Sequence, residues 1–168
     1  MPTLFRAVQL VHFMLPSYAA NMAPPFTRFW PGWNPPLSHR WLGSHKTLLG
    51  FIAGVVTAIV TAAIQAWIAW DGAIVTSEGW LTTGLRLGFG AMAGDAVKSF
   101  FKRRLAIEPG RRWIPFDQID FAVGALVLAG PSARLGWSDI GVILLVTFAG
   151  DIAVNGIAYR LGVRETPW

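Results

Sequence analysis

The stretch that decides the fold is residues 48–70, LLGFIAGVVTAIVTAAIQAWIAW, which carries no charge. Its only side-chain amide is Gln65, and tryptophans stand at positions 67 and 70. A helix needs about 20 mostly apolar residues to cross the hydrocarbon core of a bilayer, and tryptophan is typical of the headgroup level. The segment therefore predicts a transmembrane helix.

Four more apolar segments flank this one, at residues 4–23, 80–101, 119–133 and 140–161. His12 and Pro16 interrupt the first of them, and a cleaved signal peptide is its alternative interpretation. Counting all of them, the sequence predicts an all-α integral membrane protein. About five transmembrane helices would surround a polar cavity in a single domain, residues 1–168.

The composition of the chain also favours an integral membrane protein. Of the 168 residues, 54% are hydrophobic and 14% charged, against roughly 25% charged in an average soluble domain. The chain has no cysteine, which excludes disulfides, thiolate zinc sites and a thiol nucleophile. The net charge of +5 is distributed between apolar segments, which disfavours nucleic acid as a partner.

Basic residues concentrate in alternate connections. Residues 24–47, residues 102–116 and the tail together hold ten Lys and Arg, whereas the opposite connections offer only Arg134. By the positive-inside rule, the N-terminus lies outside the plasma membrane, and the basic connections and the C-terminus lie in the cytoplasm. The polar cavity is then expected to open to the cytoplasm.

The most polar stretch is residues 94–120, GDAVKSFFKRRLAIEPGRRWIPFDQID. Helical spacing places four of its polar residues on one face, namely Asp95, Lys98, Ser99 and Lys102. Asp117 and Asp120 are three apart, so a helix beginning there would bring both carboxylates to one side.

This combination favours phosphate chemistry. Paired carboxylates suit magnesium, and Lys and Arg neutralise the remaining phosphate charge. Each pattern alone also has a structural explanation. Lys102 to Arg104 would be ordinary basic residues on the cytoplasmic side of the membrane, and Asp117 and Asp120 would cap a helix. The intramembrane Asp95 and Lys98 argue against such a purely structural reading, because charges there are costly.

Two further patterns concern the helices themselves. Asp151 and Asn155 share one face of the last segment, where a functional role and a helix-to-helix hydrogen bond are both open. Glycines spaced four apart predict close helix packing; the pairs are Gly50 and Gly54, Gly84 and Gly88, and Gly90 and Gly94.

A series of motifs runs in order along nearly the whole chain: Tyr18-Ala-Ala-Asn21, Leu42-Gly-Ser-His-Lys-Thr47, Gly94-Asp95 with Lys98-Ser99-Phe100, Lys102-Arg103-Arg104, Pro109-Gly110, Pro115-Phe-Asp117-Gln-Ile-Asp120-Phe121, Asn155-Gly-Ile-Ala-Tyr159-Arg-Leu-Gly162 and Thr166-Pro-Trp168. In these motifs the chain resembles the CDP-archaeol synthase family, membrane cytidylyltransferases related to CDP-diacylglycerol synthases. The resemblance implies transfer of a cytidylyl group from CTP to a lipid phosphate, of either the archaetidic-acid or the phosphatidic-acid kind, with magnesium as cofactor.

The resemblance also implies roles for individual residues. Asp95, Asp117 and Asp120 would hold the metal and, with Lys98, form the catalytic group. The CTP and phosphate contacts would come from Ser99, Lys102, Arg103, Lys46, Thr47, Asn21 and Asn155. CTP, the lipid phosphate and membrane lipids are the expected partners, and the oligomeric state is left open.

Two departures from the family pattern concern the substrate. Asp151 stands where many members carry a histidine, and residues 24–40 are unusually rich in Pro and Trp. Two other functions compete with the enzyme. In a small transporter, Asp95, Lys98 and Asp151 would line the pathway, but the chain has no internal repeat. A non-catalytic membrane scaffold would explain the glycine spacing and leave the buried charges without a role.

Overall fold

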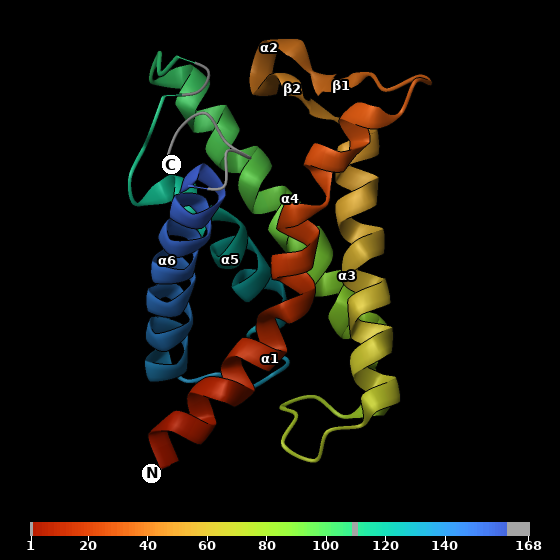
Figure 1. Cartoon of the computed structure of the whole chain (residues 1–168), viewed down its shortest axis with the longest axis vertical. Coiled ribbons are helices and arrows are strands. Elements are labelled where there is room, and N and C mark those ends of the chain that lie inside the picture. Colours follow the sequence, from red (N-terminus) through yellow and green to blue (C-terminus); the bar gives the residue numbers. More distant parts are fainter. Residues whose placement is uncertain (1, 109–110, 161–168) are drawn as a thin grey trace.

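A computed structural model describes residues 2–108 and 111–160 of the chain as a bundle of five long helices with a small hairpin at one end (Figure 1). The long helices are α1 (Pro2–Met22), α3 (Leu48–Ile68), α4 (Trp80–Arg104), α5 (Phe116–Ala129) and α6 (Trp137–Arg160). The short elements are the 3₁₀ helices η1 (Pro24–Phe29) and η2 (Ser77–Gly79), the strands β1 (Pro36–Ser38) and β2 (Gly43–Thr47), and the helix α2 (His39–Leu42). Each of the five predicted segments coincides with a long helix. The family motifs at residues 109–110 and 161–168, together with Arg164 of the predicted basic tail, lie outside the described residues.

The prediction of a purely helical chain missed the hairpin. β1 and β2 pair antiparallel, with Pro36 opposite Thr47 and Ser38 opposite Gly43. The helix α2 lies between the two strands, and Gly43 has a positive φ of 85° where the chain leaves it. A Pro-rich connection satisfies few of its own backbone groups, so pairing with the segment before α3 gives those groups partners.

Two helices have the length and composition of membrane spans in the described part of the chain, Leu48–Ile68 and Trp137–Ile157. The crossing of the membrane by the other three stays a prediction. α5 has 14 residues, or about 21 Å of helix, which is less than the roughly 30 Å hydrocarbon core.

The sequence of the apolar helix α3 accounts for both its start and its packing face. Thr47 caps its N-terminus by accepting a hydrogen bond from the Gly50 amide at 3.2 Å. Its buried face repeats every four residues and consists of Gly50, Gly54, Ala58 and Ala62. A Cβ on Gly88 of α4 would lie 2.6 Å from the Ala58 Cβ, so the predicted close helix packing is confirmed here.

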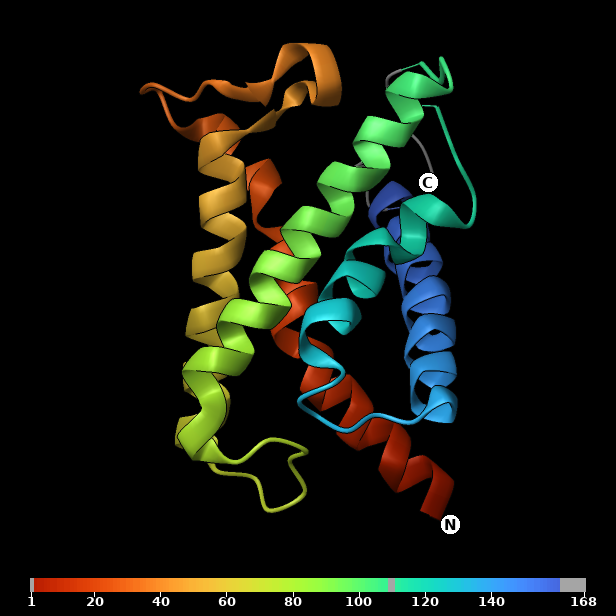
Figure 2. The ribbon, with the colours of Figure 1, turned by 180° about the vertical axis from the view of Figure 1, so that it is seen from behind.

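The core lies where α1 crosses the other helices. α1 contacts α3, α4, α5 and α6, and Leu10 and Met14 on it are fully buried, as are Leu87 of α4 and Ile143 of α6. Seen from behind, α4 runs diagonally from the η2 end of the bundle to the hairpin end (Figure 2).

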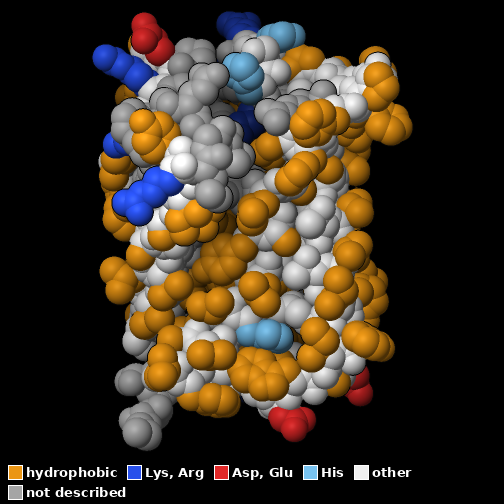
Figure 3. Space-filling view, in the orientation of Figure 1, with side chains coloured by type: hydrophobic (Ala, Val, Ile, Leu, Met, Phe, Trp, Pro, Cys, Tyr) orange, Lys and Arg blue, Asp and Glu red, His pale blue; other side chains and the backbone are white. Residues whose placement is uncertain are grey.

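The outside of the bundle is apolar around its middle. Large hydrophobic side chains are exposed on the helices, and in Figure 3 they cover the central zone while Lys and Arg gather towards the hairpin end. Trp67 and Trp137 are 86% and 90% exposed near the opposite end. An apolar belt with tryptophan at its edge is typical of a protein surrounded by lipid.

Candidate active site

At the hairpin end, the Lys98 ammonium lies among three carboxylates. Its Nζ is 2.7 Å from Asp120 Oδ2, 3.2 Å from Asp95 Oδ1 and 3.3 Å from Asp117 Oδ1. The Asp120 side chain is 6% exposed and that of Lys98 is 16% exposed. Three carboxylates therefore share one ammonium group in a largely buried position. The remaining negative charge has to be balanced by further cations.

Two more lysines supply that balance. Lys102 Nζ lies 3.0 Å from Asp117 Oδ2 and also donates to the Arg111 carbonyl at 2.5 Å. Lys46, from β2, forms an ion pair with Asp95. We call these six residues the lysine–aspartate cluster, and it contains three ammonium groups and three carboxylates: Lys46, Asp95, Lys98, Lys102, Asp117 and Asp120.

Local structure holds the carboxylates of α5 in place. Asp117, in the first turn, accepts a hydrogen bond from the Trp113 amide at 2.6 Å. Asp120 Oδ1 accepts one from the Phe121 amide at 2.6 Å. The predicted spacing of three residues does place both side chains on the side of α5 that faces α4.

Glycine sets the distance between α4 and α5. A Cβ on Gly94 would meet the Asp120 carbonyl oxygen, and would lie 3.1 Å from both the Asp120 carbonyl carbon and the Gly124 Cα. Gly90 and Gly124 approach each other's backbones as closely. Because no side chain separates the helices, the Asp120 turn lies against the turn of α4 that carries Lys98.

A cavity of about 530 Å³ opens beside the Lys46–Asp95 pair. Four residues predicted from the sequence line it: Asn21, Lys46, Thr47 and Asp95. Its other walls include His45 and Asn34, from the hairpin and the Pro-rich connection. Its volume is within the range of small-molecule sites.

The structure places three predicted residues differently. Ser99 Oγ donates to the Asp95 carbonyl at 2.9 Å, along its own helix. Asn155 donates to Asp151 at 2.9 Å, one turn earlier in α6. Arg103 lies on another face of α4, where it lines a separate small cavity with Arg40 and Arg104.

Some site features were not predicted from the sequence. The Arg111 carbonyl and the Trp113 amide are backbone groups, which no residue pattern marks. Gln118, next to Asp117, is buried with no hydrogen-bond partner for its Oε1. Its position between Asp117 and Asp120 in the Asp-Gln-x-Asp motif was the one feature of the sequence that could have indicated a role for it.

An apolar groove of about 720 Å³ lies next to the charged cavity. It runs between the end of α1, η1 and the start of α3, and its walls include Met22, Phe26, Trp30 and Leu49. Thr27 lines both the groove and the charged cavity, so the two are neighbours.

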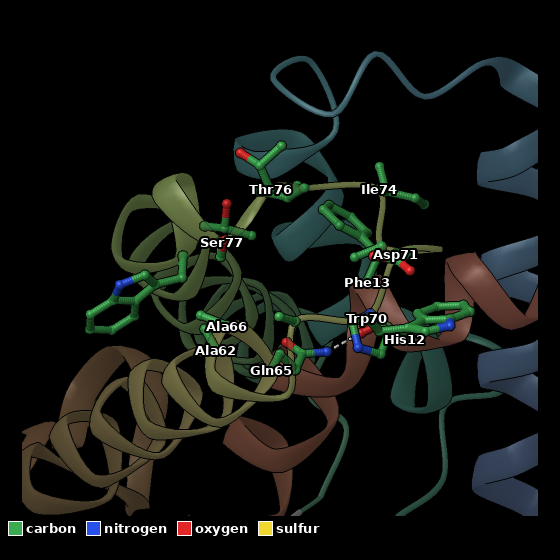
Figure 4. A pocket seen from close by; sticks show the side chains of 15 residues that line it. His12, Phe13, Ala62, Gln65, Ala66, Trp70, Asp71, Ile74, Thr76 and Ser77 are labelled. Carbon is green, nitrogen blue, oxygen red and sulfur yellow. Dashed lines mark hydrogen bonds between the residues drawn. The ribbon is translucent and has the colours of Figure 1, made fainter.

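A further cavity, of about 300 Å³, lies at the opposite end of the bundle (Figure 4). His12, Gln65, Trp70 and Asp71 are among its walls, and none of its lining residues is Lys or Arg. Gln65 donates to the His12 carbonyl at 2.6 Å, and the His12 ring packs edge-on against Trp70. A triphosphate would find no cation there.

The donor chemistry of the cluster suits magnesium, which prefers carboxylate oxygens. Within the residues that the structure describes, no group of three or more His, Cys, Asp or Glu has an arrangement for a metal ion. The position shared by the three carboxylates is held by Lys98 Nζ. A metal would therefore take carboxylate oxygens in place of one of these ammonium contacts.

Known proteins are similar to this chain along nearly its whole length. A family model described as CarS-like, CDP-archaeol synthase, matches residues 3–168. The CDP-archaeol synthase of Methanospirillum hungatei is 36% identical over 174 residues, which cover 92% of this chain and all of that protein. The one from Methanopyrus kandleri is 36% identical over 169 residues, covering 93% of this chain and 90% of its own length.

A solved structure is also similar. It is described as an intramembrane enzyme for archaeal membrane lipid biosynthesis, with a TM-score of 0.65 and 28% sequence identity. The match covers 84% of this chain and 92% of the other.

Proposed function

Because the chain belongs to the CDP-archaeol synthase family, a family of membrane cytidylyltransferases, we propose that it transfers the cytidylyl group of CTP to the phosphate of an archaeol-type ether lipid. In this reaction an oxygen of the lipid phosphate attacks the α-phosphorus of CTP. The bond from that phosphorus to the oxygen bridging to the β-phosphorus breaks, so the products are the CDP-lipid and pyrophosphate.

The observation that carries the proposal is the lysine–aspartate cluster beside the 530 Å³ cavity. Phosphoryl-type transfer needs positioning and charge stabilisation more than a covalent nucleophile. The ammonium groups of Lys46, Lys98 and Lys102 are already held in place by carboxylates. Triphosphate oxygens can replace those partners without leaving a lysine unpaired.

Of the remaining residues, Asn21, Thr47 and Asp95 line the cavity, whereas Asp117 and Asp120 are joined to it through the lysine–aspartate cluster. Asn21 and Thr47 contact the nucleotide from its walls, and Ser99 and Asn155 stay predicted contacts. Asp95, Asp117 and Asp120 would hold magnesium, and the metal would supply charge neutralisation at the reacting phosphates. Arg103 faces another cavity, so its predicted contact with the triphosphate needs a movement of its side chain.

The apolar groove takes the lipid chains in this proposal. Its aromatic and aliphatic walls suit hydrocarbon, and its contact with the charged cavity at Thr27 allows the lipid phosphate to reach the nucleotide. The basic connections support a site that faces the cytoplasm, where CTP is available, with the N-terminus outside the plasma membrane.

The test is turnover by the purified full-length chain in detergent. We expect CDP-lipid and pyrophosphate only when CTP, magnesium and an archaeol-type lipid phosphate are all present. Asp117→Asn and Asp120→Asn should each lower turnover about 10²–10³-fold, because a carboxylate that binds metal is lost. Asp71→Asn, at the opposite end of the bundle, is the matched control and should keep full turnover.

Two results would count against the proposal. Undiminished turnover in both cluster variants would remove the metal assignment. Pyrophosphate release that does not depend on the lipid would show that the lipid phosphate is not the acceptor.

A further inference from the structure

Three guanidinium groups meet around a small cavity of about 200 Å³ on the side of α4 that faces α2. The cavity is lined by Arg40, Trp41, Phe100, Arg103 and Arg104, which we call the arginine pocket. Residues 100, 103 and 104 share one face of α4, whereas the cluster residues Asp95, Lys98 and Lys102 share another. The pocket is therefore separate from the proposed nucleotide cavity.

The aromatic rings of the pocket contact two of its three arginines. Trp41 and Phe100 are stacked, with ring centroids 5.6 Å apart and planes at 22°. The Arg104 guanidinium lies 4.8 Å from the Trp41 ring centroid, and that of Arg40 lies 5.4 Å from the same ring. Such contacts offset part of the repulsion between like charges but neutralise none of it.

Among the residues that the structure describes, no Asp or Glu lines the pocket. Among the described residues, Arg40, Arg103 and Arg104 form no ion pair with a carboxylate. The Nε of Arg103 is buried and has no hydrogen-bond partner. The guanidinium groups of Arg40 and Arg104 beside Trp41, with Arg103 lining the same cavity, favour an acceptor with several oxygens.

We propose that the arginine pocket binds a phosphate group, which guanidinium groups recognise through paired N–H donors. The side chains of Phe101, in the last turn of α4, and of Leu105, the residue after that helix, are exposed, and Trp41 of the pocket is itself 41% exposed. Apolar and tryptophan side chains beside a basic site are typical of the headgroup level of a membrane. The phosphate thus comes from the headgroup of an anionic phospholipid or from free phosphate in solution.

The experiment measures the thermal unfolding midpoint of the full-length protein in dodecyl maltoside with EDTA and no CTP. One arm adds phosphatidylglycerol to the micelles, with phosphatidylcholine of the same chains as its control. A second arm adds inorganic pyrophosphate. We expect phosphatidylglycerol to raise the midpoint by roughly 3–5 °C at saturation, because a ligand that binds only the folded state stabilises it.

Three double variants distinguish binding at the arginine pocket from a general effect of the protein's positive charge. Arg40→Gln/Arg104→Gln should abolish the shift, and Arg40→Lys/Arg104→Lys should keep part of it. Arg86→Gln/Arg134→Gln removes two arginines elsewhere and should respond like the wild type.

The two arms identify the source of the phosphate. A shift with phosphatidylglycerol that the Gln double variant loses supports a lipid headgroup, and a pyrophosphate shift that it loses supports free phosphate. The proposal is overturned if the Gln double variant keeps the wild-type shift in both arms, or if neither addition shifts the wild type.

Discussion

The two ends of the helix bundle both carry a cavity, but the polar side chains in or next to the two cavities are paired in different ways. At the η2 end, Gln65 donates to the His12 carbonyl and Gln9 donates to the Gly72 carbonyl at 2.7 Å. At the hairpin end, lysines and aspartates pair with one another. Amides bound to backbone carbonyls hold a helix or a loop in place, whereas ion pairs can exchange a partner for a charged ligand.

Under the proposed function, the difference explains why the reaction takes place at one end. A phosphate entering the hairpin end would find cations and would leave carboxylates free to take a metal. A ligand entering the η2 end finds backbone groups that are already satisfied. Variants at each end test whether the two ends differ in this way.

The largest effect is expected for Lys98→Met. The substitution keeps most of the side-chain volume but leaves three carboxylates without their shared cation, so we expect a loss of about 3–5 kcal/mol in the free energy of unfolding. Turnover should be lost as well. Thermal and chemical unfolding in detergent measure the first effect.

Magnesium gives this prediction a second readout. If the carboxylates hold the metal, magnesium should raise the unfolding midpoint of Lys98→Met more than that of the wild type. Arg86→Met, an exposed cation on the same helix, is the control. Equal stability of the two variants would mean that the cluster is not held by its charges.

A smaller effect is expected where α4 meets α5. Gly94→Ala places a methyl group against the Asp120 carbonyl, so the helices must separate at the turn that carries a cluster carboxylate. We expect a loss of about 1–3 kcal/mol in stability from overpacking. Turnover should fall roughly 10²-fold, because a shift of about 1 Å misplaces Asp120 relative to Lys98.

Gly150→Ala in α6 is the matched control, because nothing lies within 4 Å of a Cβ there. It should be neutral or slightly stabilising. If Gly94→Ala matches it in both turnover and unfolding midpoint, the contact between the helices does not set the site.

The sequence predicted the parts of the molecule that depend on local pattern. The five long helices were predicted from the length of their apolar segments. The placement of Asp117 and Asp120 on one side of a helix, and the shared face of Asp95 and Lys98, follow from helical periodicity, which is a property of neighbouring residues. The chain's place in a cytidylyltransferase family followed from motifs that run in order along it.

What the sequence did not show depends on contacts between distant segments. The partner of Lys46 is 49 positions away, and the Arg111 carbonyl is a backbone group that any residue would carry. The hairpin was missed because its strands are three and five residues long, too short for an alternating pattern. The family resemblance grouped Arg103 with Lys102 as a phosphate contact, although consecutive helical residues point about 100° apart.

The smallest effect is expected at the opposite end, for Arg6→Gln. Arg6 makes two contacts with Asp139, at 3.0 and 2.7 Å, and so ties the start of α1 to the start of α6. Its side chain is 39% exposed, so solvent screens the pair and the loss should be about 0.5–1 kcal/mol, falling as salt is added. Turnover should stay unchanged, since the pair touches neither the cluster nor the 530 Å³ cavity. Arg134→Gln, at the same end, is the control for the lost charge. A large loss of turnover in Arg6→Gln would show that the ends are coupled and that the η2 end does more than hold the helices together.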